Sequence, residues 1–233
     1  MNTMKKYELT DETKLYNGRT LHRIIALRDF GNVKKGDKGG WIEKEKNLSH
    51  DGSCWVYDNA QVYDNAWVFD NAKVFDNAQV YGNAWAFGSA KVLGNAWAFG
   101  SAKVFDKVQI FDKAQVFDKA QVSGNSTVSG NSYVGGNAQI CDNSKVYDNS
   151  HVGGNAQICY DTKIFNNADY IVFKNWWSSG RYFTWTRSNN MWAVGCFYGT
   201  GDELIKKAYA DSEDKGKHYE EIVEYVNKCV LKK

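Results

Sequence analysis

The sequence predicts a mainly β protein: a single-stranded parallel β-helix of about six triangular coils, a small β cap before it and an α+β domain after it. Three observations predict this fold class. An aliphatic residue returns at every sixth position, a turn-forming pair follows at a fixed distance, and the composition changes abruptly after Ala168. The predicted divisions are residues 1–50, 51–169 and 170–233.

Residues 1–50 are expected to form a β-hairpin cap, because an open β-solenoid exposes unpaired strands at its ends. Asn17-Gly18 lies between two runs that carry apolar residues, which is the strongest short-range signal for a hairpin. The residues that follow alternate as they do in a strand: Leu21, Arg23, Ile25 and Leu27.

From Val56 to Ile164 the six-residue period gives 19 hexads in one unbroken frame. In a stretch such as "AQVY", Ala and Val point to one side of a strand while Gln and Tyr point to the other. The Asp-Asn or Gly-Asn pair that follows is typical of a turn, because these residues tolerate φ > 0. Each hexad therefore predicts a four-residue strand and a corner, and three hexads close an 18-residue coil, with coils stacked about 4.8 Å apart.

The hexads resemble the left-handed parallel β-helix family, whose pattern is an aliphatic residue, three less restricted positions, a small residue and one more. The segment "VYDNAW" from Val62 to Trp67 matches that pattern at each position. Left-handedness is implied by this resemblance, since the general crossover rule favours the right hand. The ends resemble uncharacterised hexapeptide-repeat proteins of bacteriophages and prophages, in "RIIALRDFG", "GGWIEKEKNLS" and "YFTWTRSNNMWAVGCFYGTGDELIKKAY".

After Ala168 the segments "YIVFKNWW", "RYFTWTR" and "MWAVGCFYG" predict a three-stranded antiparallel meander. Thr200 and Glu203 are spaced as a capping box that opens a helix. A second amphipathic helix is predicted by apolar residues at helical spacing: Tyr219, Ile222, Val223, Val226 and Val230.

Residues 18 apart should lie one above another, so the outward aromatic residues are expected to form columns. The columns are Tyr63, Tyr81, Phe99 and Phe117; Phe69, Phe87 and Phe105; and Tyr57, Phe75 and Phe111, the last broken by Leu93. Trp67 is expected to stack over Trp85. A partner is expected on Trp67, Phe69, Trp85 and Phe87, because large aromatic side chains commonly anchor interfaces. The alternatives are that the columns only stabilise neighbouring strands or that they stack sugars or bases.

A second candidate ligand surface lies in the C-terminal domain. By alternation, Arg181, Phe183, Trp185 and Arg187 share one strand face. Two guanidinium groups beside two rings suit an anionic planar ligand such as a nucleotide. In the alternative interpretation, Trp185 belongs to the core and the arginines extend over it.

The family resemblance also implies an acyltransferase alternative, in which a His acts as general base on acyl-coenzyme A. Of the four histidines only His151 lies firmly in the repeats, and no loop breaks the frame between Val56 and Ala168. We therefore predict no catalytic residue, with His151 as the alternative. The zinc enzymes of the family need three His ligands, so neither a metal nor a cofactor is predicted.

The composition limits which classes of partner the chain is expected to bind. The formal net charge is +2, from 29 basic and 27 acidic residues, and does not indicate nucleic acid or an anionic membrane. No apolar run of about 18 residues and no signal-like start is present, so a cytoplasmic protein is expected. Five cysteines then favour free thiols. Cys141 and Cys159 should stack near disulfide distance, with the reduced pair expected.

These observations predict a non-catalytic binding protein of a bacteriophage or mobile element. Its partner would be a host protein or signalling molecule, bound so as to inhibit host defence. A structural virion scaffold is a further alternative to the acyltransferase. The family resemblance implies a homo-oligomer, with a trimer as the commonest form.

Overall fold

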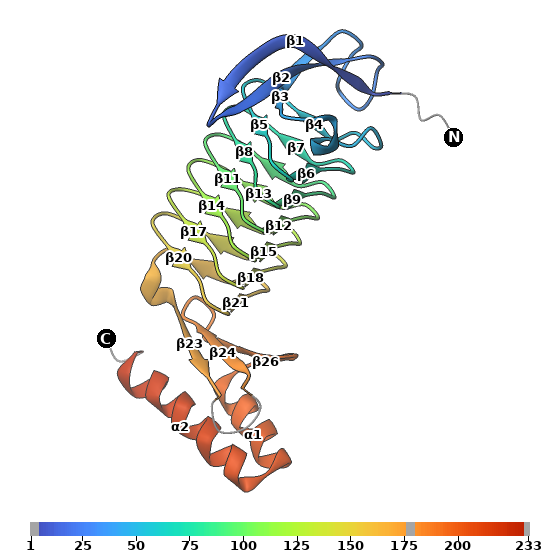
Figure 1. The fold of residues 1–233 in the computed structure, drawn as a ribbon. Helices are drawn as coiled ribbons and strands as arrows, with labels where there is room; N and C mark the ends of the chain where they lie inside the picture. Colours follow the sequence, from blue (N-terminus) through green and yellow to red (C-terminus); the bar gives the residue numbers. More distant parts are fainter. Residues whose placement is uncertain (1–4, 176–179, 231–233) are drawn as a thin grey trace. The chain divides into compact units, whose positions relative to one another are not determined.

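The computed structural model describes residues 5–175 and 180–230, and the chain forms two compact units, Met1–Asn167 and Ala168–Lys233. The first unit is a parallel β-solenoid of about seven turns that begins at an antiparallel hairpin (Figure 1). The second is a small antiparallel sheet with two helices. The mainly β fold class is confirmed.

Nineteen short strands, one for each predicted hexad, build the three sides of the solenoid. Side 1 contains β5 (Gln61–Val62), β8 (Gln79–Val80), β11 (Trp97–Ala98), β14 (Gln115–Val116), β17 (Tyr133–Val134) and β20 (His151–Val152). Side 2 contains β6 (Trp67–Val68), β9 (Trp85–Ala86), β12 (Lys103–Val104), β15 (Gln121–Val122), β18 (Gln139–Ile140) and β21 (Gln157–Ile158). Side 3 contains β4 (Trp55–Val56), β7 (Lys73–Val74), β10 (Lys91–Val92), β13 (Gln109–Ile110), β16 (Thr127–Val128), β19 (Lys145–Val146) and β22 (Lys163–Ile164).

Each strand is two residues long rather than the predicted four, with its first residue directed outward and its second inward. The inward Val62 and the small residue before the strand, Ala60, are both fully buried. The ladder joins residues 18 apart, as in the parallel pairing of Val62 with Val80. Burying an inward Val contributes roughly 1.5–3 kcal/mol, and the solenoid repeats that contribution along its length.

The corners use the backbone conformation that the Asp-Asn and Gly-Asn pairs predict. Asp112 has φ 60°, and its Oδ2 accepts a hydrogen bond from the backbone N–H of Gly130 in the next coil at 3.0 Å. Amide side chains also join successive corners: Asn125 Nδ2 donates to Asn143 Oδ1 at 3.3 Å. The corners therefore tie coil to coil through side chains as well as through backbone.

The N-terminal segment continues the solenoid. Strands β1 (Tyr7–Tyr16) and β2 (Arg19–Ala26) form the predicted hairpin, and its turn residues Asn17 and Gly18 have φ 49° and 75°. Strand β3 (Lys38–Ile42) pairs antiparallel with β2 and parallel with β5, so side 1 is a nine-stranded sheet. This extra rung raises the number of turns from about six to about seven.

Carbonyl groups of the first coil are capped by residues 41–49, which include the 3-10 helix η1 (Glu45–Asn47). Four donors reach them: Trp41 N to Ala60 O (2.9 Å), Glu43 N to Val62 O (3.1 Å), Asn47 Nδ2 to Ala66 O (2.9 Å) and Ser49 N to Val68 O (2.9 Å). These four carbonyl groups, on sides 1 and 2 of the rim, are therefore paired.

The second unit begins near the 3-10 helix η2 (Asn167–Asp169), and its described residues form four strands rather than the predicted three. They are β23 (Tyr170–Lys174), β24 (Tyr182–Thr186), β25 (Met191–Val194) and β26 (Phe197–Gly199), paired antiparallel in chain order. The third predicted strand is divided because Gly195 takes φ 60° and reverses the chain. Trp176 and Trp177, at the end of the first predicted strand, lie outside the described residues.

Both predicted helices are present, as α1 (Gly201–Asp211) and α2 (Glu213–Cys229). The capping box is confirmed: Glu203 N donates to Thr200 Oγ1 at 3.3 Å, and Thr200 N donates to Glu203 Oε2 at 2.8 Å. Val223 and Val226 of α2 are buried and pack in one core with residues of the sheet. This core decides which face of β24 is covered.

Candidate binding surfaces

The first two predicted aromatic columns and the first pair of the third are present on the solenoid. Ring centroids in the first column are separated by 5.0 Å for Tyr63–Tyr81, 4.9 Å for Tyr81–Phe99 and 5.4 Å for Phe99–Phe117. The second column has 4.8 Å for Phe69–Phe87 and 5.0 Å for Phe87–Phe105, and the third begins with 4.4 Å for Tyr57–Phe75. All these pairs are stacked, as an 18-residue coil requires.

Most of these column rings serve the structure. Tyr63 is buried, and burial is the main cause that raises the pKa of its hydroxyl. The rings below it, Tyr81, Phe99 and Phe117, are half-buried. Stacked, half-buried rings stabilise parallel strands and leave only their edges to a partner.

Trp67 and Trp85 differ from the column rings, because they occupy the outward strand position on side 2 and are 39% and 40% exposed. Trp67 lies edge-on to Trp85 at 6.1 Å rather than stacked over it, and it stacks instead on Phe69 at 4.1 Å. Phe87 stacks on Phe69 from the next coil. We call Trp67, Phe69, Trp85 and Phe87 the tryptophan face.

A cation borders the tryptophan face. Lys103 is the cross-strand neighbour of Trp85 in the next coil, and its Nζ lies 5.3 Å from the Trp85 ring. Beyond it the same strand position carries Gln121 and Gln139, both exposed. The result is an exposed aromatic pair on a rigid sheet with a polar border, which is the composition of an interface anchor.

A polar groove of about 410 Å³, not among the surfaces predicted from the sequence, lies on side 1 beside the hairpin. Its lining residues are Tyr16, Gln61, Asn77, Gln79, Asn95, Trp97, Lys113 and Gln115. Within this lining, the Tyr16 hydroxyl accepts a hydrogen bond from Gln79 Nε2 at 3.1 Å. Buried Gln61 Oε1 has no hydrogen-bond partner among the described residues. The signal was present as Gln, Gln, Trp and Gln at every third hexad.

The second predicted ligand surface is corrected by the structure. Phe183 and Trp185 are fully buried in the core of the second unit, so neither ring offers a face to a stacking ligand. Trp185 Nε1 donates to Asn190 Oδ1 at 2.8 Å. Arg181 and Arg187 are exposed, and the Arg187 guanidinium lies 5.9 Å from the Trp185 ring. The alternative interpretation, in which Trp185 belongs to the core, is therefore the one that the structure supports.

His151, the alternative catalytic residue, is exposed on side 1 and stacks on Tyr133 at 4.6 Å. Its backbone N–H donates to Asn167 Oδ1 at 2.7 Å. It lies in the same outward column as Trp97 and Gln115 of the polar groove, two coils beyond Gln115. The structure does not bring it to the lining of that groove.

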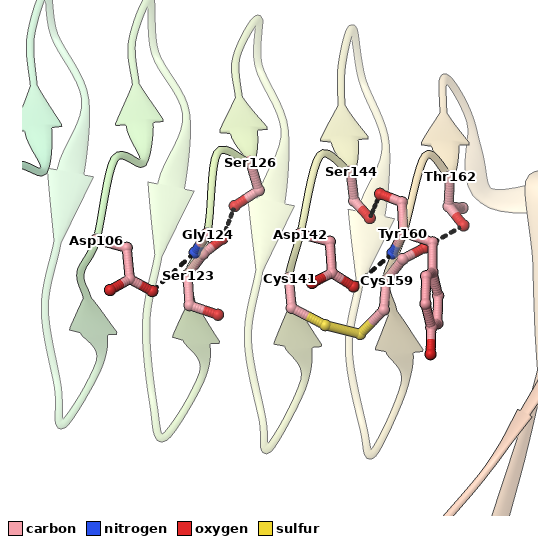
Figure 2. The surroundings of a disulfide bond; sticks show 10 residues. All are labelled: Asp106, Ser123, Gly124, Ser126, Cys141, Asp142, Ser144, Cys159, Tyr160 and Thr162. Atoms are coloured by element: carbon pink, nitrogen blue, oxygen red, sulfur yellow. Dashed lines mark hydrogen bonds between the residues drawn. A yellow bond between two sulfur atoms is a disulfide. The ribbon is translucent and has the colours of Figure 1, made fainter. Parts of the chain in front are cut away.

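Cys141 and Cys159 lie in consecutive coils and form a disulfide, with a Cα–Cα distance of 4.6 Å (Figure 2). The stacking of this pair is confirmed, and the expectation of free thiols is wrong for it. The register of side 2 is the reason, since Ile140 pairs with Ile158 directly before the two cysteines. Cys54, Cys196 and Cys229 are free, and burial raises the pKa of the Cys54 thiol.

Neither helix in the described part of the chain has the length and apolarity needed to cross a membrane.

Comparison with known proteins supports the repeat β-helix resemblance. Residues 120–136 match a family model described as YdcK Beta solenoid repeat. A protein of Escherichia coli (strain K12) named "Uncharacterized acetyltransferase YdcK" is 36% identical over 67 residues, which cover 25% of this chain and 21% of that protein. The chain thus spans about a fifth of the length of the curated relative it matches. The resemblance of the two ends to bacteriophage proteins stays a prediction.

Proposed function

We propose that this chain is a non-catalytic binding protein that holds a protein partner on the tryptophan face. One observation carries the proposal: Trp67 and Trp85 remain 39% and 40% exposed on neighbouring strands of one parallel ladder, in which β9 pairs with β6 on one side and with β12 on the other. Fixed aromatic side chains lose little conformational entropy when a partner covers them. Tryptophan is also enriched among residues that dominate binding energy.

The setting of this function comes from the resemblance of the chain ends to bacteriophage and prophage proteins. On that basis the partner is a host macromolecule, and its occupation would inhibit host defence. The proposal includes a homo-oligomer of this chain, for which the tryptophan face is not required.

The experiment is affinity capture from a bacterial lysate with the tagged protein, followed by mass spectrometry. Trp67→Ser with Trp85→Ser should lose a partner that the native chain recovers in stoichiometric amount. The matched control is Phe165→Ser, which removes a ring that is 46% exposed at a corner beside side 3. Loss in the control, or capture that is equal in the tryptophan variant, would contradict the proposal; capture of this chain alone would support a structural scaffold.

The second candidate function is acyl transfer, and it rests on the name of the E. coli relative. If it is correct, the purified protein should consume acetyl-coenzyme A in the presence of common acceptors, and His151→Ala should abolish that activity. The free thiol of coenzyme A, which appears as acetyl-coenzyme A loses its acetyl group, measures this activity directly. Activity that survives His151→Ala would remove His151 from the chemistry.

A further inference from the structure

The backbone holds Cys141 and Cys159 together independently of their sulfur chemistry. Cys141 N donates to Ile158 O at 2.9 Å, and Asn143 N donates to Tyr160 O at 3.0 Å. These bonds bracket the cysteine pair in the parallel ladder between β18 and β21. Breaking the disulfide therefore leaves the two side chains facing one another on neighbouring coils.

Asp142 adds a third donor at the same place. Its φ of 58° turns the corner after Cys141, and its Oδ2 accepts a hydrogen bond from Tyr160 N at 2.9 Å (Figure 2). The carboxylate thus reaches the coil that carries Cys159. One ligand atom from each of the three residues lies within 4.8 Å of the others, and the described part of the chain has no second group of this kind.

We propose that the reduced form of Cys141 and Cys159, together with Asp142, binds one thiophilic divalent cation, of which zinc and cadmium are the representatives. Two thiolates and a carboxylate are donors that zinc accepts in tetrahedral sites. With zinc–sulfur bonds of about 2.3 Å, two sulfurs on a tetrahedral ion lie about 3.8 Å apart. Side chains on residues whose Cα atoms are 4.6 Å apart span that distance without backbone movement.

Access to the site is open. Both cysteines are half-buried and Asp142 is exposed, so a hydrated ion approaches from solvent and keeps water as its fourth ligand. Because the two sulfur atoms are partly buried, fewer water molecules compete with the metal ion for them. The cysteine pair is therefore placed differently from Cys54, which is buried and contacts the Lys6 amine at 3.1 Å.

The disulfide and the metal exclude each other, because the ion needs both sulfurs as thiolates. A water-soluble phosphine supplies the two electrons: the sulfur–sulfur bond breaks, the phosphine takes the oxygen of a water molecule to become its oxide, and two thiols form. Metal binding then displaces the two thiol protons to the buffer. The end of the solenoid would hold either a covalent cross-link or an ion at the same position.

The test begins from a chain carrying Cys196→Ser and Cys229→Ser, which removes the two exposed free thiols. This parent is reduced with the phosphine. The phosphine is then removed under anaerobic conditions, and the reduced protein is titrated with cadmium. The thiolate-to-cadmium charge-transfer absorption and native mass spectrometry report binding. We expect one cadmium per reduced chain and none per unreduced chain, a comparison that needs no substitution at the site.

Two variants separate the ligands. Cys141→Ser with Cys159→Ser should abolish cadmium uptake, and Asp142→Asn, which keeps the corner conformation and an oxygen for Tyr160, should weaken it measurably because it removes the carboxylate charge from the ligand set. Circular dichroism checks that each variant retains the solenoid. No uptake by the reduced parent, equal uptake before reduction, or uptake that persists without the cysteines would overturn the site. If the Asp142→Asn variant binds cadmium with unchanged affinity, Asp142 is not the third ligand of the site.

Discussion

Gly135 lies where the first column of rings ends. A Cβ placed on Gly135 would lie 2.5 Å from Cζ of Phe117, whose other neighbour in the column is Phe99 at 5.4 Å. Gly153 occupies the same corner position one coil later, and a Cβ there would meet no atom of the described residues within 4 Å. Neither glycine has a positive φ, so the two positions differ in space rather than in backbone strain.

Gly135→Ala is therefore expected to lower the free energy of unfolding by about 1–3 kcal/mol, because the new methyl group displaces a ring that is stacked on its neighbour. Gly153→Ala is expected to be neutral or to stabilise by up to about 1 kcal/mol, since alanine restricts the unfolded chain. Urea unfolding of both variants measures the difference. Equal effects at the two positions would show that Phe117 moves freely.

Lys14 carries a pH dependence that can be assigned to one amine. Its Nζ lies 4.5 Å from the Trp41 ring, and burial together with the nearby Arg23 charge lowers its pKa to about 8. The unfolded chain keeps a lysine pKa of about 10.4 and so binds more protons than the folded chain between pH 8 and 10. Stability contributed by this residue therefore rises with pH across that window.

Lys14→Met removes the titrating amine and keeps an apolar stem beside Trp41. The free energy of unfolding of the native chain, minus that of the variant, should increase from pH 8 to pH 10. Denaturant unfolding at several pH values gives this difference, in which the tyrosines common to both chains cancel. A difference that stays level across the window would refute the assignment.

Sequence alternation placed Phe183 and Trp185 on one strand face but did not indicate what covers that face. Val223 and Val226 of α2 cover it, and they are separated from the strand by about 40 residues of chain. Packing of the helix therefore overrides the ligand interpretation, whereas Trp67 and Trp85 have no covering element within the solenoid ladder and stay exposed.

The corner is the element on which the whole repeat depends. Asp112→Ala should lower the free energy of unfolding by about 2–3 kcal/mol. Alanine adopts a left-handed backbone conformation less favourably than aspartate, and it leaves Gly130 N without its carboxylate acceptor. Asp112→Asn is the control, since asparagine tolerates the same conformation and offers an oxygen; it should stay within about 1 kcal/mol of the native chain. Thermal unfolding compares the two, and similar losses would contradict the corner argument.

Elements were predicted well where their signal repeats and less well where it appears once. The corners follow from Asp-Asn and Gly-Asn pairs that recur in the hexads, so their conformation was foreseeable. β3 lies outside the hexad frame in "KGGWI", and nothing local marks its pairing with β5. Gly195 interrupts an otherwise continuous apolar run, and only its positive φ reveals the turn.

The 18-residue coil is the unit of the solenoid that can be removed. Deleting residues 103–120 takes out one full coil and leaves every outward column in register, so the chain should still unfold cooperatively. Deleting residues 103–122 also removes the strand Gln121–Val122, and side 2 then has a gap in its ladder.

The longer deletion is expected to melt several degrees below the shorter one, since one buried Val alone contributes roughly 1.5–3 kcal/mol in a chain of this size. Calorimetry measures both midpoints. If the two deletions melt together, the solenoid tolerates a missing strand and the coil is not its structural unit.

The overall architecture could be predicted because each coil contacts only its neighbours, and one correct hexad therefore implies all the others. The candidate site could be predicted only in part, since exposure at Trp67 and Trp85 follows from the period but the partner does not. The polar groove depends on the hairpin, where Tyr16 meets Gln79 across 63 positions of sequence. No local pattern specifies such a contact.

The hydrogen bonds that Trp41, Glu43, Asn47 and Ser49 donate to the first coil bear on how copies of the chain can associate. Those four carbonyl groups already accept hydrogen bonds within the chain. The backbone amides of a second copy of the solenoid therefore cannot extend the ladder there. Head-to-tail growth into filaments, to which open solenoids are prone, is thereby blocked at this rim. Concentrated solutions of the protein should accordingly stay free of fibrils nucleated there.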